Sequence, residues 1–165
     1  MTNEQALLWA KIQAFELDDS ENSLTFTDRL ARENGWSLEL SLRTIREYKK
    51  FIFLICISNE PITPSDQVDQ VWHLHLLYTQ SYWMEFCRDT LGKQIHHGPT
   101  KGGKKETSKY TDWYEKTLHL YETIFHQLPP KDIWPDKQTR FEHIHYELVN
   151  KHTHWIIKKP SFFKK

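Results

Sequence analysis

The fold depends largely on one stretch, Leu38-Glu-Leu-Ser-Leu-Arg-Thr-Ile-Arg-Glu-Tyr-Lys-Lys-Phe-Ile-Phe-Leu-Ile-Cys-Ile57. Its apolar residues recur at helical spacing, and the preceding Ser37 is a typical N-cap residue. The second half, from Phe51 to Ile57, is apolar throughout. That composition suits a helix buried on nearly all sides, but it also suits a strand. Because the helical pattern is continuous from residue 38 onward, we predict a helix, with a strand over 51–57 as the alternative.

Helical patterns flank this stretch on both sides. Gly35 and Gly92 stand where two of these patterns end and are suited to left-handed C-caps, while Ser65 is suited to an N-cap. The predicted helices cover residues 3–17, 26–35, 38–57, 65–91 and 105–127. We therefore predict a mainly α fold, with about five helices packed in one domain around the helices 38–57 and 65–91.

The last third of the chain has a different pattern. Residues 141–149 and 152–157 show a partial alternation of apolar and polar side chains, so we predict an irregular or short β C-terminal segment. If those segments are strands, His143 with His145, and His152 with His154, each share a face and form a candidate surface site. Residues 159–165 are predicted to be a frayed basic tail, which leaves 1–165 as a single domain.

Composition excludes several classes of protein. The 22 Lys and Arg residues are balanced by 22 Asp and Glu residues, so nothing indicates nucleic-acid binding driven by net charge. The longest apolar run, 51–57, is far shorter than the about 20 residues of a membrane helix, and the N-terminus carries no signal-peptide pattern. We therefore predict a small soluble domain in the cytoplasm with no membrane partner. The basic stretch Lys101–Lys109 is a candidate contact for an anionic partner.

The chain has ten histidines but only two cysteines, and four of these histidines fall within residues 68–97. Asp69 and His73 are four residues apart, which places both on one face of a helix at a spacing suited to two metal ligands. His75 lies about 200° around the helix from His73, on the apolar face. We therefore predict that His75 is a buried, hydrogen-bonded residue and a weaker ligand candidate.

Distance along the chain limits which residues can share an ion. In a straight helix Cys87 lies about 21 Å from His73, so these two cannot form one site. His96 and His97 can return to Cys87 easily, but they reach His73 only if the helix bends or ends early. One candidate site is therefore Asp69 and His73 with His96 or His97; the other is Cys87 with His96 or His97.

Histidine and carboxylate ligands suit zinc or iron. An ion held in this way keeps positions open for water activation or oxygen chemistry, so the first site is also a candidate catalytic centre, although no catalytic residue can be assigned.

Two other interpretations stay open. In the first, Asp69 only orients His73, the segment Trp72–His75 belongs to the core, and the domain is a non-enzymatic module whose aromatic surface binds a protein or RNA. In the second, Cys87 is a redox group or nucleophile with His96 as its base.

The element Trp72-His-Leu-His75, followed by Tyr82, Phe86-Cys87 and Ile95-His-His97, resembles the glycine-rich domain-containing protein-like family. This is a domain of unknown function found at the front of plant glycine-rich domain proteins and in shorter bacterial proteins. The resemblance covers about residues 40–160 and extends to Trp113-Tyr114, Asp132-Ile-Trp-Pro135 and Trp155-Ile-Ile-Lys-Lys-Pro160. It implies a functional centre at Trp72, His73, His75 and His96-His97, with Tyr82 in support, but it implies no reaction. The sequence has no long glycine-rich tail, so roles that depend on such a tail are not expected.

Overall fold

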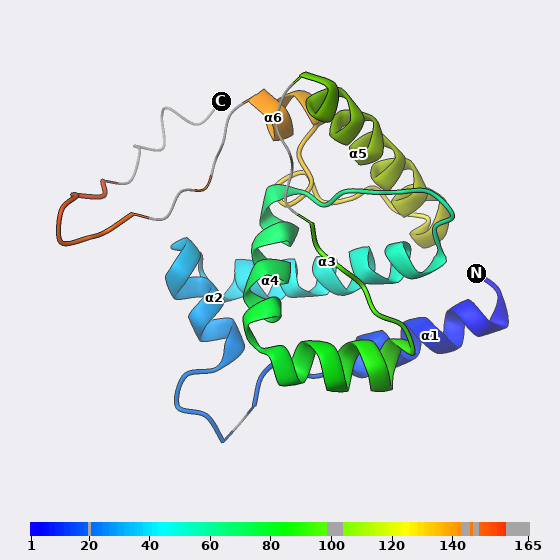
Figure 1. The fold of residues 1–165 in the computed structure, drawn as a ribbon, viewed down its shortest axis with the longest axis horizontal. Coiled ribbons are helices and arrows are strands. Elements are labelled where there is room, and N and C mark those ends of the chain that lie inside the picture. Colours follow the sequence, from blue (N-terminus) through cyan, green and yellow to red (C-terminus); the bar gives the residue numbers. More distant parts are fainter. Residues whose placement is uncertain (20, 99–103, 143–145, 147–148, 158–165) are drawn as a thin grey trace.

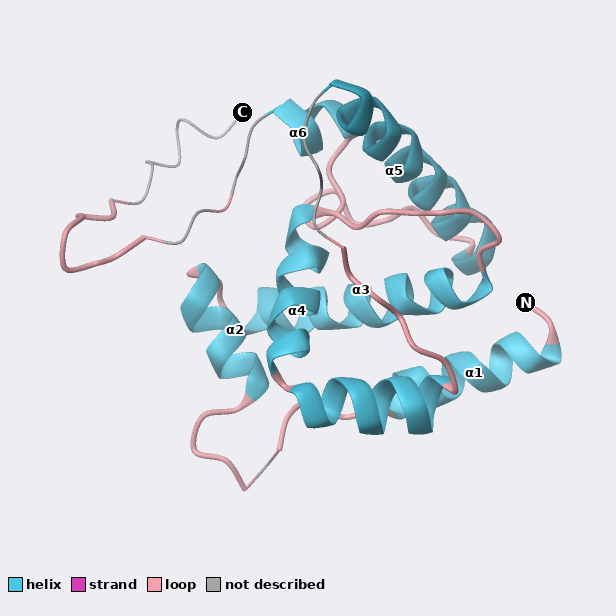
Figure 2. Ribbon diagram, viewed as in Figure 1, coloured by secondary structure: helices cyan, strands magenta, loops and turns pink. Residues whose placement is uncertain are grey.

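The computed structural model describes residues 1–19, 21–98, 104–142, 146 and 149–157. Within these residues the chain forms seven helices and no strand (Figures 1 and 2). They are α1 (Asn3–Ala14), α2 (Phe26–Asn34), α3 (Leu38–Ile57), α4 (Asp66–Leu77), η1 (Gln80–Leu91), α5 (Lys104–Phe125) and α6 (Lys137–Glu142), of which η1 is a π-helix. The predicted mainly α fold is confirmed, and residues 51–57 are helical.

The four predicted caps each mark one end of a helix, namely the ends of α2 and η1 and the starts of α3 and α4. The hydroxyls of Ser37 and Ser65 each accept the amide of the third following residue, at 3.1 and 3.2 Å. Gly35 and Gly92 are the C-caps of α2 and η1, with φ of 65° and 67°, a left-handed conformation that costs least at glycine. The first helix is shorter than the predicted 3–17, because the backbone is extended at Phe15.

Helix α3 lies at the centre of the packing. It contacts α1, α2, α4 and α5, which surround it in Figure 1. Its residues Phe51, Ile52 and Phe53 are therefore fully buried. Trp9 of α1 packs against Phe53 with ring centroids 5.4 Å apart. This enclosure explains why the sequence of α3 is apolar all round in its second half.

The predicted unbroken helix 65–91 is wrong. Helix α4 ends at Leu77, the chain turns sharply, and η1 begins at Gln80 (Figure 1). The backbone leaves helical geometry at Tyr78 (φ −88°, ψ 66°). The Tyr78 ring contacts α2, with its centroid 5.4 Å from the ring of Phe26 and 5.6 Å from the guanidinium of Arg29. Because of this turn, the segment after η1 runs back beside α4.

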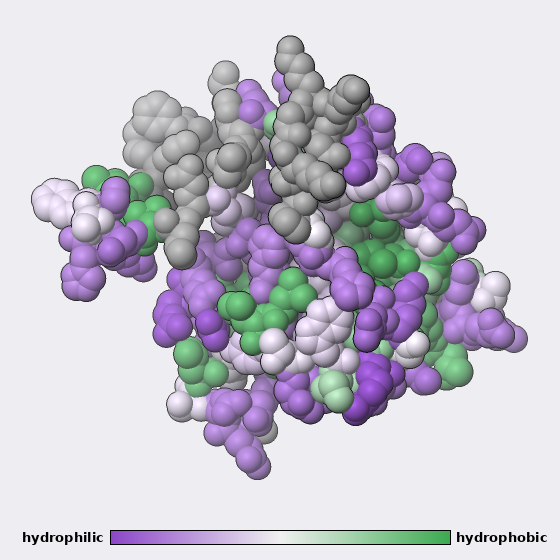
Figure 3. All heavy atoms as spheres, viewed as in Figure 1, coloured by the Kyte–Doolittle hydropathy of each residue, from purple (hydrophilic) through white to green (hydrophobic). Residues whose placement is uncertain are grey.

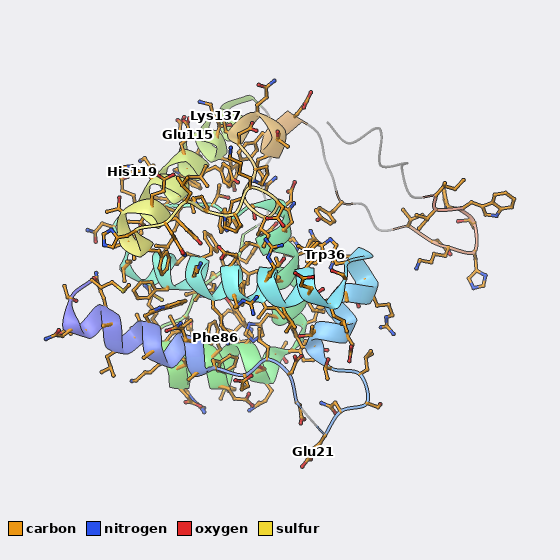
Figure 4. The ribbon with its side chains drawn as sticks, turned by 180° about the vertical axis from the view of Figure 1, so that it is seen from behind. Glu21, Trp36, Phe86, Glu115, His119 and Lys137 are labelled. Atoms are coloured by element: carbon orange, nitrogen blue, oxygen red, sulfur yellow. The ribbon has the colours of Figure 1, made fainter. Side chains whose placement is uncertain are left out.

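The predicted short β segment is also wrong for the described C-terminal residues. Lys137–Glu142 form a helix, and residues 150–154 form a turn in which Asn150 O accepts the amide of Thr153 at 3.1 Å. The irregular alternative is therefore correct there. An ion pair of 2.6 Å between Glu115 and Lys137 joins α5 to α6 (Figure 4). His143, His145 and the tail 159–165 lie outside the described residues.

The described surface is mostly polar, with apolar side chains gathered in small patches on the face shown in Figure 3. No helix in the described ranges combines the length and apolarity needed to cross a membrane. Most of the basic stretch Lys101–Lys109 lies outside the described side chains. Lys109 places its ammonium 4.3 Å from the centroid of Trp113. Contact with an anionic partner stays a prediction.

A buried carboxylate ties α3 to α5 and to the loop before α6. Glu47 is only 6% exposed. Its Oε1 accepts hydrogen bonds from Lys50 Nζ at 2.8 Å and from Tyr121 Oη at 3.3 Å, and its Oε2 accepts one from Trp134 Nε1 at 2.9 Å. Trp134 belongs to the Asp132–Pro135 motif, so this motif has a structural role.

We expect Glu47→Ala to lower the free energy of unfolding by about 3 kcal/mol, since it removes the opposite charge from the partly buried ammonium of Lys50 and the acceptor from the buried indole N–H of Trp134. Urea denaturation measures this. Glu33→Ala is the matched control: it removes an exposed i,i+4 ion pair with Arg29, which is worth only about 0.3–0.5 kcal/mol. Equal losses in the two variants would contradict the structural role of Glu47.

Candidate metal centre

Three of the predicted ligand residues meet on one face of α4. Asp69 lies in the first turn of α4 and His73 lies one turn later, while His97 comes from the segment that follows η1. Asp69 Oδ1 is 2.7 Å from His97 Nε2, and Asp69 Oδ2 is 3.6 Å from His73 Nε2. The two imidazole centroids are 4.6 Å apart. One ligand atom from each residue lies within 4.8 Å of the other two.

These separations suit a small divalent cation. Zinc bonds to nitrogen and oxygen of about 2.0–2.1 Å in a tetrahedron place neighbouring ligand atoms about 3.3 Å apart. The distance from His97 Nε2 to Asp69 Oδ1 is 2.7 Å and that from His73 Nε2 to Asp69 Oδ2 is 3.6 Å, so each imidazole lies near this spacing from one carboxylate oxygen.

The cluster is partly open to solvent. The side chain of His73 is 49% exposed, whereas those of Asp69 and His97 are 20% and 17% exposed. The candidate ligands Asp69 and His97 are thus mostly buried, whereas His73 is about half exposed to solvent. A cation bound by these three groups would keep at least one coordination position on the solvent side, as catalytic zinc sites do.

The turn between α4 and η1 brings His97 to this cluster. With a straight helix over 65–91, the segment after it could not bring a histidine back to His73. The sequence predicts that His97 reaches His73 only if this helix bends or ends early, and α4 does end early, at Leu77. His96 is not part of the cluster. It is exposed, and the centroid of its ring lies 5.3 Å from that of Trp83. Of the two adjacent histidines, only His97 joins Asp69 and His73.

Trp72 and Tyr82, predicted as supporting residues, lie directly behind the cluster. The Tyr82 hydroxyl accepts a hydrogen bond from Trp72 Nε1 at 2.9 Å and donates one to Ile95 O at 2.6 Å. The Trp72 ring meets the His97 ring nearly edge to face, with centroids 4.5 Å apart. Burial is the main reason why the pKa of Tyr82 is raised, so its hydroxyl keeps its proton.

His75 is buried and hydrogen-bonded, as predicted. Its Nδ1 is 2.9 Å from Tyr48 Oη and its Nε2 is 3.3 Å from Ser81 Oγ. It is surrounded by aromatic rings, namely those of Phe15, Phe26, Tyr48, Tyr82 and Phe86. This burial lowers the pKa of His75 to about 3, so the ring stays neutral near pH 7. Both ring nitrogens are occupied by the hydrogen bonds to Tyr48 and Ser81.

Cys87 is not one of the residues whose ligand atoms meet at the cluster. It is fully buried, and burial raises its pKa, opposed by the backbone amide of Ile95. Burial likewise raises the pKa of Cys56 to about 11. A thiol that stays protonated is a poor nucleophile. His96, its candidate base, packs against Trp83 on the surface, so the geometry does not favour the nucleophile interpretation.

Comparison with known proteins agrees with the family resemblance that the segment Trp72–His75 indicated. A family model described as UCP032817-like matches residues 15–119, which include Asp69, His73 and His97. The chain is also similar to "Glycine-rich domain-containing protein 1" of Arabidopsis thaliana, with 28% identity over 86 residues, which are 49% of this chain and 10% of that protein. The chain thus matches only a tenth of that relative's length. No solved structure matches it. The resemblance to glycine-rich domain-containing proteins is confirmed, and the chain belongs to the UCP032817-like family.

Proposed function

We propose that this protein binds one divalent transition-metal ion, zinc or iron, through Asp69, His73 and His97. The observation that carries the proposal is the convergence of one carboxylate and two imidazoles, with ligand atoms within 4.8 Å of one another. Two histidines and one carboxylate form a ligand set used both by hydrolytic zinc sites and by non-haem iron sites.

The chemistry open to such an ion follows from the exposure of the cluster. With three protein ligands and a solvent-facing side, the ion would polarise a bound water or a ligand oxygen. The chain's own part is to orient the ligands: Asp69 lies between the two imidazoles, and Trp72 fixes the ring of His97 from behind.

An ion and a proton compete for the same atoms at this site. The 2.7 Å contact between Asp69 Oδ1 and His97 Nε2 is a hydrogen bond that needs a proton on the imidazole nitrogen. An ion can bind Nε2 only after this proton has left the nitrogen, either to solvent or to the other ring nitrogen, because the ion needs the Nε2 lone pair. Protons therefore compete with the ion, and its affinity falls as the solution becomes acidic.

The direct test is a zinc titration by competition with a chromophoric chelator, repeated with iron(II) without oxygen. We expect one ion per chain. Asp69→Asn keeps the size of the side chain but removes its negative charge, so we expect it to lose most of the affinity. His119→Ala, on the exposed outer side of α5 (Figure 4), is the control and should bind like the wild type.

Two results would contradict the proposal. One is a purified protein that takes up neither metal in stoichiometric amount. The other is a protein whose uptake is unchanged by Asp69→Asn. Either result would leave the interaction-module interpretation, in which the buried Trp72 and His75 serve only the core.

A further inference from the structure

The third ligand of the cluster lies on a segment without regular secondary structure. Residues 93–98 connect η1 to the stretch before α5 and form neither helix nor strand. Asp69 and His73, by contrast, are held on one helix. The position of His97 therefore depends on what fixes this segment to α4.

A single hydroxyl bridges the two parts. Tyr82 Oη accepts a hydrogen bond from the indole of Trp72, which lies on α4 beside His73, and donates one to the carbonyl of Ile95, two residues before His97. Tyr82 is fully buried and Ile95 is 5% exposed, so water does not replace these bonds. The same indole also packs against the His97 ring, so Trp72 contacts the returning segment directly as well as through Tyr82.

Building on the proposed function, we infer that Tyr82 is a positioning residue: its hydroxyl holds the segment 93–98 against α4 and so presents His97 to Asp69 and His73. Outer groups that orient metal ligands in this way typically change affinity by about 10–100-fold when they are removed. The consequence is a two-way coupling. The bridge prepares the site for an ion, and an ion at the site restrains the segment between η1 and α5.

The test compares two substitutions that each delete one buried hydroxyl. Tyr82→Phe removes both bonds of the bridge. Tyr114→Phe removes the hydroxyl that donates to Pro135 O at 2.8 Å, between α5 and the loop before α6, away from the cluster. We expect Tyr82→Phe to weaken zinc affinity about tenfold or more, and Tyr114→Phe to bind zinc like the wild type even where it unfolds more easily.

A second measurement does not depend on metal. In metal-free protein, hydrogen exchange at the amides of residues 94–97 should become faster in Tyr82→Phe than in Tyr114→Phe, while the amides of α3 stay equally protected in the two. If Tyr82→Phe does not fold, Trp72→Phe breaks the one bond that ties the Tyr82 hydroxyl to α4, and it carries the same two expectations.

The outcomes separate this inference from the proposed function. If the wild type binds no zinc, the proposed function fails, and exchange at residues 94–97 alone decides the positioning role. If the wild type binds zinc but Tyr82→Phe binds it equally well, the positioning role fails and the metal site stands. Equal loss of affinity in Tyr82→Phe and Tyr114→Phe would also overturn the positioning role, because it would reflect general destabilisation.

Discussion

His97→Ala is expected to weaken zinc binding by about 100-fold or more, while His96→Ala leaves it unchanged. Zinc sites in small domains are worth about 10–16 kcal/mol. Removing one of three protein ligands should therefore cost at least about 3 kcal/mol, and each 1.4 kcal/mol is a factor of ten. Chelator competition at constant pH measures both dissociation constants.

The His96 variant is a demanding control because the two histidines are adjacent in the chain. Both substitutions remove one imidazole from the same segment, but only His97 contacts Asp69, with its Nε2 at 2.7 Å from Asp69 Oδ1. His96 instead contacts Trp83. Loss of affinity in His96→Ala alone would show that the ion uses the other imidazole.

His75 is expected to make the fold sensitive to acid. Burial lowers its pKa to about 3 in the native protein, against 6.5 for a free imidazole. Between these two values the unfolded chain binds a proton that the native chain does not. The contribution of neutral His75 to stability is therefore complete above pH 6.5 and is lost as the pH falls toward 3, at about 1.4 kcal/mol per pH unit.

The measurement is the free energy of unfolding in urea at several pH values between 7 and 4. Other groups also titrate, so the informative quantity is the difference between the wild type and His75→Gln, whose amide still has hydrogen-bonding groups for Tyr48 and Ser81. We expect a shallower pH dependence in that variant. His119→Gln, at an exposed position, should keep the wild-type slope. An unchanged slope in His75→Gln would show that His75 is not buried as a neutral ring.

Local sequence rules predicted much of this fold because the relevant signals are local. A serine cap needs only the amide of its own first turn, and Gly35 and Gly92 need only their own backbone geometry. The helical phase placed His75 toward the core and opposite to His73, and the structure buries it there. The same phase grouped Asp69 with His73.

Tertiary contacts determine what the sequence could not show. The stretch Leu77-Tyr-Thr-Gln80 contains neither glycine nor proline, and the break at Tyr78 is fixed by contacts with Phe26 and Arg29 on another helix. The choice of His97 over His96 depends on this break. The structural role of Glu47 could not be predicted from the sequence either, because its partners Tyr121 and Trp134 lie more than 70 positions away along the chain.

The turn at Tyr78 also has a consequence for how the chain folds. Asp69 and His73 meet as soon as one helical turn forms, but His97 lies 28 residues after Asp69 and arrives only when a long loop has closed, at a cost in chain entropy. The unfolded chain therefore offers an ion two ligands, and the native chain offers three. An ion that prefers three ligands shifts the equilibrium toward the native state by mass action, so the proposed metal would add to the stability that the buried core already supplies.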